Sequence, residues 1–146
     1  MATIQRFEDI FAWKVVRMLV SDVYEVSKRQ IFFQDTAMRD QIRRAVLSIP
    51  SNIAEGFERG TTKEFINFLY IAKGSVGEVR SQLYNALDQH YISPEEFQVF
   101  HEKCVKTSQA IANFIDYLKK CAKPKRTSSA QPSSLDTDIW SKTSTL

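Results

Sequence analysis

The sequence predicts an all-α protein, an up-down-up-down antiparallel four-helix bundle with a kinked second helix and a flexible C-terminal tail. Three observations favour this fold. Apolar residues recur at steps of three and four over most of the chain, which is the period of an amphipathic helix. The 146 residues include only 4 Gly and 4 Pro, too few for short strands joined by many turns. The periodic stretches are separated by short connections, which join antiparallel neighbours in helix bundles.

The first helix is expected over residues 10–27. Glu8 and Asp9 precede it, where negative charge favours the positive end of the helix dipole. Its inward stripe is predicted to consist of Phe11, Val15, Met18, Leu19, Val23 and Val26. Residues 28–35 are expected to form a connecting loop.

The second helix is expected over residues 36–58 and contains the most distinctive stretch of the chain, QIRRAVLSIPSNIAEGFERG at 41–60. Pro50 removes one backbone hydrogen bond and clashes with the preceding turn, at a cost of about 3 kcal/mol, so we expect a kink that packing must offset. Glycine adopts the left-handed conformation easily, so Gly56 and Gly60 mark the end of the helix. The inward residues are Ile42, Ala45, Ile49, Ile53 and Phe57.

The third helix is predicted to begin at a capping box formed by Thr61 and Glu64. Its apolar stripe is close to a heptad seam and consists of Phe65, Leu69, Ala72, Val76, Val79, Leu83 and Leu87.

The fourth helix is predicted to begin at Ser93-Pro94-Glu95-Glu96, an N-cap followed by a proline and a capping glutamate. Its stripe consists of Phe97, Phe100, Cys104, Thr107, Ile111, Phe114, Leu118 and Cys121. Both cysteines lie on this stripe, about 25 Å apart by helical rise, so we expect two buried thiols and no disulfide between them.

The bundle is expected to occupy residues 1–121 as one domain, and residues 122–146 to form a Ser/Thr-rich flexible tail. Within the tail, Ile139 and Trp140 are either an anchor for a partner or solvated residues. The N-terminus lacks the pattern of a signal peptide and no apolar run could cross a bilayer, which predicts a cytoplasmic protein without a membrane partner. The net charge of +3 permits contact with a polyanion but does not require it.

Two polar lines are expected to face each other on the second and third helices. The lines consist of Ser48, Asn52 and Glu55, and of Ser75, Glu78 and Gln82. We expect an interhelical hydrogen-bond network that also satisfies the carbonyl left without a donor by the helix proline. Two glutamates on facing helices resemble part of a di-iron site, but the Glu-x-x-His pairs of such sites are missing, so no metal and no cofactor is predicted.

Cationic residues lie on the same two helices. They are Arg39, Arg43 and Arg44 on the second helix, and Lys73 and Arg80 on a stripe with Ile66, Tyr70, Gly77 and Tyr84 on the third. Cations beside aromatic rings suit phosphate contact combined with base stacking. The same residue types are enriched at subunit interfaces, and an ordinary solvated face is the third interpretation. All three interpretations remain open from the sequence.

Three stretches resemble the family of ribosomal-RNA intervening-sequence proteins: FEDIFAWK at 7–14, the stretch at 41–60, and EFINFLYIAKGSVGEVRSQL at 64–83. The resemblance covers about residues 7–118. It implies a four-helix bundle that assembles into a ring, a homopentamer. In that family some members are encoded inside insertions of the large-subunit ribosomal RNA gene. A related group of accessory proteins binds a reverse transcriptase and its RNA, and no enzymatic activity is established for the family.

We therefore expect a non-enzymatic, ring-forming accessory or scaffold protein associated with nucleic acid. Its expected partners are further copies of itself, RNA or DNA, and a reverse transcriptase or another protein. The alternative is a protein-interaction module that binds a partner protein without nucleic acid. No Gly-rich phosphate loop or nucleophile motif is found, which argues against an enzyme.

Overall fold

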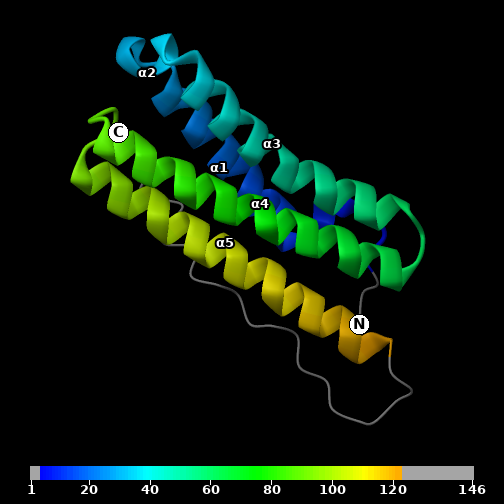
Figure 1. Cartoon of the computed structure of the whole chain (residues 1–146). Helices are drawn as coiled ribbons and strands as arrows, with labels where there is room; N and C mark the ends of the chain where they lie inside the picture. Colours follow the sequence, from blue (N-terminus) through cyan, green and yellow to red (C-terminus); the bar gives the residue numbers. More distant parts are fainter. Residues whose placement is uncertain (1–3, 123–146) are drawn as a thin grey trace.

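The computed structural model describes residues 4–122, and in this part of the chain it contains helices and no strand. The elements are the 3-10 helix η1 Phe7–Asp9 and the α-helices α1 Phe11–Ser27, α2 Gln30–Gln34, α3 Thr36–Glu58, α4 Thr62–Asp88 and α5 Pro94–Cys121 (Figure 1). The prediction of an all-α protein is confirmed. Within the described residues, no helix is long and apolar enough to cross a membrane.

The four long helices pack in a closed cycle, in which α1 contacts α3 and α5, and α4 contacts the same two helices. The short connections 59–61 and 89–93 join helices that pack along their lengths, so α4 is antiparallel to both α3 and α5 (Figure 1). Asp22 of α1 pairs with Lys103 of α5, and Arg29, two residues after the end of α1, pairs with Glu96 near the start of α5. These two ion pairs make α1 and α5 antiparallel too. The α1–α3 seam and the α4–α5 seam therefore lie on opposite sides of the molecule.

Local capping explains where α4 and α5 begin. The Thr61 hydroxyl accepts the backbone N–H of Glu64 at 3.3 Å, and it donates to the Glu64 carboxylate at 3.1 Å. At α5 the capping box is fully reciprocal: the Ser93 hydroxyl accepts from the Glu96 N–H at 3.1 Å, and the Glu96 carboxylate accepts from the Ser93 N–H at 2.9 Å. Gly60 follows α3 with φ 87°, the left-handed conformation that favours glycine.

The connection between α1 and α3 differs from the prediction of a loop over residues 28–35. Residues 30–34 form α2, a helix too short to be stable by itself. It is stabilised by the ring of Phe32, which is 0% exposed and lies 5.2 Å from the ring of Tyr91. Asp35 then caps α3 by accepting the backbone N–H of Met38 at 3.1 Å.

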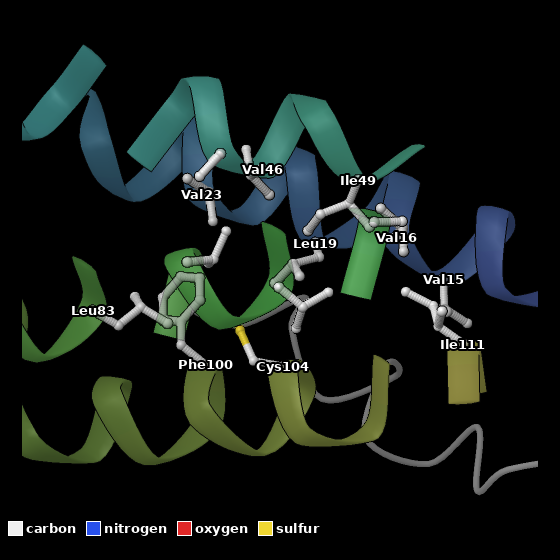
Figure 2. Close-up of a cluster of buried hydrophobic side chains, with 14 of the residues drawn as sticks. Val15, Val16, Leu19, Val23, Val46, Ile49, Leu83, Phe100, Cys104 and Ile111 are labelled. Carbon is white, nitrogen blue, oxygen red and sulfur yellow. The ribbon is translucent and has the colours of Figure 1, made fainter. Parts of the chain in front are cut away.

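Side chains from all four long helices meet in one core (Figure 2). Most residues of the predicted stripes are buried in it, four are partly buried against it (Phe57, Leu87, Phe114 and Leu118), and three are exposed. Phe11 and Met18 are 40% and 41% exposed, because the buried side of α1 is centred on Val16, Leu19 and Val23 instead. Cys121 is exposed, in contrast to buried Cys104, because it is the last residue of α5.

Helix α3 begins and ends at the predicted residues and continues through Pro50. The kink at this proline stays a prediction. The predicted tail over residues 122–146, including its Ile139–Trp140 pair, lies outside the described residues except for Ala122, so the domain boundary also stays a prediction.

Candidate functional site

Arg43 is held against α1 and α2. Its Nε donates a hydrogen bond of 2.8 Å to the Ser27 hydroxyl. Its guanidinium lies over two rings, 4.5 Å from the centroid of Tyr24 and 5.5 Å from that of Phe33. These contacts hold the guanidinium of Arg43 at the α1–α3 seam in a defined orientation. Aromatic rings of the same chain lie against it there.

Arg39 takes part in the same cluster. Its guanidinium lies 4.4 Å from the Phe33 centroid, its Nη1 donates to the Phe33 carbonyl at 3.0 Å, and its Nε lies 3.0 Å from the Asp40 carboxylate. Arg44 is exposed on α3, and among the ion pairs of residues 4–122 none includes it. The three arginines of α3 therefore do not act as one patch.

Two cations of α4, Lys73 and Arg80, lie at the α4–α5 seam. Arg80 is close enough to buried Cys104 on α5 to interact electrostatically with its thiol, and Lys73 shares that side of α4 because it lies two turns earlier. The Nε of Arg80 is buried without a hydrogen-bond partner among the described residues. We call the surface here the α4–α5 face, and it consists of Tyr70, Lys73, Arg80, Tyr84, His101 and Lys119.

Two half-exposed tyrosines frame the α4–α5 face. Tyr84 is 48% exposed, and its ring lies 4.7 Å from Phe97 and 6.0 Å from His101. Tyr70 is 49% exposed, and its hydroxyl accepts a hydrogen bond of 2.7 Å from Lys119, which raises the pKa of that lysine. Each ring therefore keeps a surface open to solvent while contacts with α5 restrict its position.

The glycines between these tyrosines do not pack against a neighbouring helix of the chain. A Cβ added at Gly74 or at Gly77 would meet nothing within 4 Å. The backbone of α4 is consequently accessible between Tyr70 and Tyr84. The close approach of two helices occurs instead at Gly56, where an added Cβ would lie 2.6 Å from the Cβ of Phe68.

The two predicted polar lines meet at one point. The hydroxyls of Ser48 and Ser75 lie 2.9 Å apart across α3 and α4. Asn52 donates to the Ser48 hydroxyl at 2.9 Å and to the Ser48 carbonyl at 2.7 Å. Pro50 leaves the carbonyl of Val46, four residues earlier, without a backbone donor, and the network was expected to satisfy that carbonyl. The hydrogen bonds reach Ser48 instead, so they satisfy a different group.

The glutamates of those lines are not part of this contact. Glu55 is exposed and pairs with Arg59 at 3.0 Å, on the same side of α3 and one turn later. Glu78 is exposed on α4. The described residues contain no group of three or more His, Cys, Asp or Glu side chains that could hold a metal ion. The arrangement is therefore a hydrogen-bonded contact between helices.

Lys103 is a charged residue outside the site residues predicted from the sequence. Its side chain is 1% exposed, and its Nζ lies 2.8 Å from the Asp22 carboxylate, which joins α5 to α1. Both residues of the pair line a hollow of about 430 Å³ between these helices. The Arg29–Glu96 pair also lines it, with Arg29 Nη1 donating to Glu96 at 2.8 Å.

A signal for Lys103 was present in the sequence. It lies three residues after Phe100 and four before Thr107, so it occupies a position on the apolar stripe of α5. A lysine at such a position is either buried with a counter-charge or at the edge of the stripe. Neighbouring Cys104 lies in the same buried environment. Burial raises the pKa of its thiol to about 12, and the charges of Arg80 and Lys103 oppose this rise. That thiol is not a reactive nucleophile at neutral pH.

Known proteins are similar to this chain over most of its described residues. A family model described as 23S rRNA-intervening sequence protein matches residues 8–113. None of the curated proteins matches the chain. A crystal structure from Bacteroides thetaiotaomicron is similar in fold, with a TM-score of 0.60 and 22% sequence identity over 71% of this chain and 94% of that chain. That protein is described as one of unknown function from the S23 ribosomal protein family.

Proposed function

Because the chain belongs to the 23S rRNA-intervening sequence protein family, we propose that it is a nucleic-acid-associated accessory or scaffold protein that works without catalysis. In this proposal the chain is an antiparallel four-helix bundle, and its copies assemble into a ring, a homopentamer. The nucleic acid binds to the α4–α5 face of each copy. The resemblance expected from the sequence is confirmed by the family match, and the family has no assigned activity.

The observation that carries this proposal is the pairing of open tyrosine rings with cations on the α4–α5 face. Tyr70 and Tyr84 are about half exposed. Among the ion pairs of residues 4–122, none includes Lys73 or Arg80. An exposed ring accepts a stacked base, which contributes about 1–3 kcal/mol, and an adjacent cation contacts the phosphate. Single-stranded RNA suits this combination because its bases are free to stack.

The two arginines at the α1–α3 seam support the proposal less well. Arg39 and Arg43 already contact the aromatic rings and carbonyl groups of their own chain. A phosphate at this seam would have fewer free guanidinium donors, and a base would have to displace an arginine from the ring of Phe33. We therefore assign nucleic-acid contact primarily to Lys73 and Arg80.

Assembly would supply the affinity that one face lacks. Two or three phosphate contacts give weak binding that salt removes readily. A closed ring repeats the face, so that the second and later contacts of one RNA strand form at a high effective concentration.

The test is fluorescence anisotropy with a labelled single-stranded RNA at low and raised salt. We expect salt-sensitive binding that Lys73→Glu weakens and that Tyr70→Ala, a change at an exposed residue, weakens without altering the charge. Lys14→Glu, at an exposed position of α1, is the matched control and should bind more tightly than Lys73→Glu. Equal binding by all variants, or no binding at low salt, contradicts the proposal. Light scattering that gives the mass of one chain contradicts the ring.

A second candidate function is a module that binds a partner protein without nucleic acid. It is favoured by two aliphatic side chains on the exposed sides of α3 and α4, Leu47 at 43% and Ile71 at 51% exposure. Aliphatic groups do not stack on bases, whereas exposed apolar residues mark protein interfaces. Retention of a specific protein from a nuclease-treated lysate by the wild-type chain, and its loss with Ile71→Ser, would favour this candidate over the first.

A further inference from the structure

We propose that residues 135–140 of this chain, LDTDIW, bind to a surface built by α2 and the arginines of α3. We call this surface the α2 platform, and it consists of Ile31, Phe33, Arg39 and Arg43. The segment comes either from the same chain or from a neighbouring copy. This inference does not depend on nucleic-acid binding, because the platform lies at the α1–α3 seam and the α4–α5 face lies on the opposite side.

The α2 platform combines exposed apolar groups with cations held in place. Ile31 is 56% exposed, the largest fraction among the exposed large apolar residues of the described chain, and Phe33 is 45% exposed. The ring of Phe33 contacts two guanidiniums, those of Arg39 at 4.4 Å and of Arg43 at 5.5 Å. Aromatic residues and arginine are the types enriched at interface hot spots, and a surface that is already ordered loses little entropy on binding.

The charge of the platform indicates the chemistry of its occupant. The partners of Arg43 are two rings and a hydroxyl, and among the ion pairs of residues 4–122 none includes it. A carboxylate that approached its remaining N–H groups would form charge-assisted hydrogen bonds. The platform therefore suits a segment in which acidic residues alternate with large apolar ones.

The chain itself contains such a segment beyond the described residues. In residues 123–146 the acidic residues are Asp136 and Asp138, and both lie between Leu135 and the Ile139–Trp140 pair. The segment thus offers two carboxylates for the arginines and three large apolar side chains that could contact Ile31 and the part of Phe33 that the arginines leave exposed.

A second hollow could accept the apolar side chains but not the carboxylates. It has a volume of about 410 Å³ and lies between the α3–α4 connection and the end of α5. Aromatic residues such as Phe57, Phe65 and Phe114 line it, and its lining includes no Lys, Arg or His. Binding there would leave Asp136 and Asp138 without a counter-charge among the lining residues. The α2 platform is therefore the better match.

The length of the chain permits the contact. The platform is near the start of α5, and α5 has 28 residues, so its end lies about 42 Å away. Residues 122–134 span at most about 45 Å when fully extended. The segment thus reaches the platform of its own chain only when the linking residues are almost straight, and a neighbouring copy in an assembly is the other acceptor.

The fluorescence of Trp140 tests the proposal in the full chain. The chain has two tryptophans, and Trp13→Phe leaves Trp140 alone while keeping an aromatic ring against Phe7. We expect Trp140 in this background to show blue-shifted emission and protection from acrylamide. Adding Asp136→Asn and Asp138→Asn, which alter no residue of the described part of the chain, should shift the emission to the red and increase quenching.

A change on the platform should have the same effect. Phe33→Ser in the Trp13→Phe background should expose Trp140, whereas Phe11→Ser, at a residue 40% exposed on the far end of α1, is the matched control and should not. Emission and quenching of Trp140 equal to those of a free LDTDIW peptide, or insensitive to both the Asp136/Asp138 and the Phe33 variants, would overturn the proposal. Protection that persists on dilution identifies the same chain as the acceptor, and protection lost on dilution identifies a neighbouring copy.

Discussion

The ammonium group of Lys103 on α5 lies 2.8 Å from the carboxylate of Asp22 on α1, although 81 residues separate the two in sequence. The lysine is 1% exposed, so its charge lies in the interior, and the carboxylate compensates part of the cost of removing it from water. The pair also favours one register of α5 against α1, because sliding either helix would separate the buried ammonium from this carboxylate.

This pair predicts an asymmetry between two substitutions. Asp22→Ala removes the carboxylate and leaves a buried cation without it, so we expect the free energy of unfolding to fall by about 3 kcal/mol. Lys103→Met replaces the charge by an apolar chain of similar length, and we expect it to be neutral or stabilising. Urea denaturation of both variants measures the difference. Equal destabilisation by the two would show that removing this carboxylate from the buried ammonium costs no more than replacing the charge itself.

The contact between Arg29 and Glu96 predicts a dependence of stability on pH. The hydrogen bonds from Arg29 hold the pKa of Glu96 at about 2, below its ordinary 4.5, while burial opposes this shift and the Ser93 N–H supports it. Because the folded pKa lies below the unfolded one, the contribution of Glu96 to stability is complete above pH 4.5 and is lost as the pH falls towards 2.

Denaturation midpoints measured between pH 6 and pH 2 test this dependence. Glu96→Gln should lose stability at neutral pH and show a smaller further decline in acid than the wild type. Glu95→Gln is the matched control, because Glu95 is the exposed neighbour in the same first turn of α5. A wild-type decline that Glu96→Gln leaves unchanged would assign the acid sensitivity to other carboxylates.

The close approach of α3 and α4 predicts opposite effects of one substitution at three glycines. At Gly56 an added Cβ would lie 2.6 Å from Phe68 and 3.0 Å from the ring of Phe65, so Gly56→Ala should destabilise by about 1–3 kcal/mol despite the higher helix propensity of alanine. At Gly74 and Gly77 nothing obstructs a Cβ, and alanine there should stabilise by up to about 1 kcal/mol. Thermal unfolding monitored by circular dichroism distinguishes the three, and a Gly56→Ala variant as stable as the wild type would contradict the tight contact.

Much of the fold could be predicted from local signals. Helix α3 has the predicted bounds, and α4 and α5 begin after the predicted caps at Thr61 and Ser93, because capping depends on residues within one turn of each other. Apolar periodicity likewise indicated most of the core. It did not predict α2, since a helix of five residues is stabilised by the burial of Phe32 and carries no periodic pattern.

The candidate site could be predicted only in part. The sequence identified the cations and tyrosines that belong to the α4–α5 face, because Lys73 and Arg80 share one side of a single helix with Tyr70 and Tyr84. It could not separate them from Arg39 and Arg43, which lie on another helix whose orientation depends on packing. It also pointed to two polar lines, of which Ser48, Asn52 and Ser75 meet while the glutamates remain exposed.

The order of amphipathic segments and their caps determined by itself that residues 4–122 are helical, where α3, α4 and α5 begin, and which face of these three helices is apolar. These properties depend on interactions within a few residues along the chain. Tertiary structure alone decided that Lys103 is buried against Asp22, and that the two sets of cations lie on opposite sides of the molecule. Whether a residue is buried, and whether two residues share a surface, depends on which helices become neighbours. The free energy that selects those neighbours comes from the packing of the whole core.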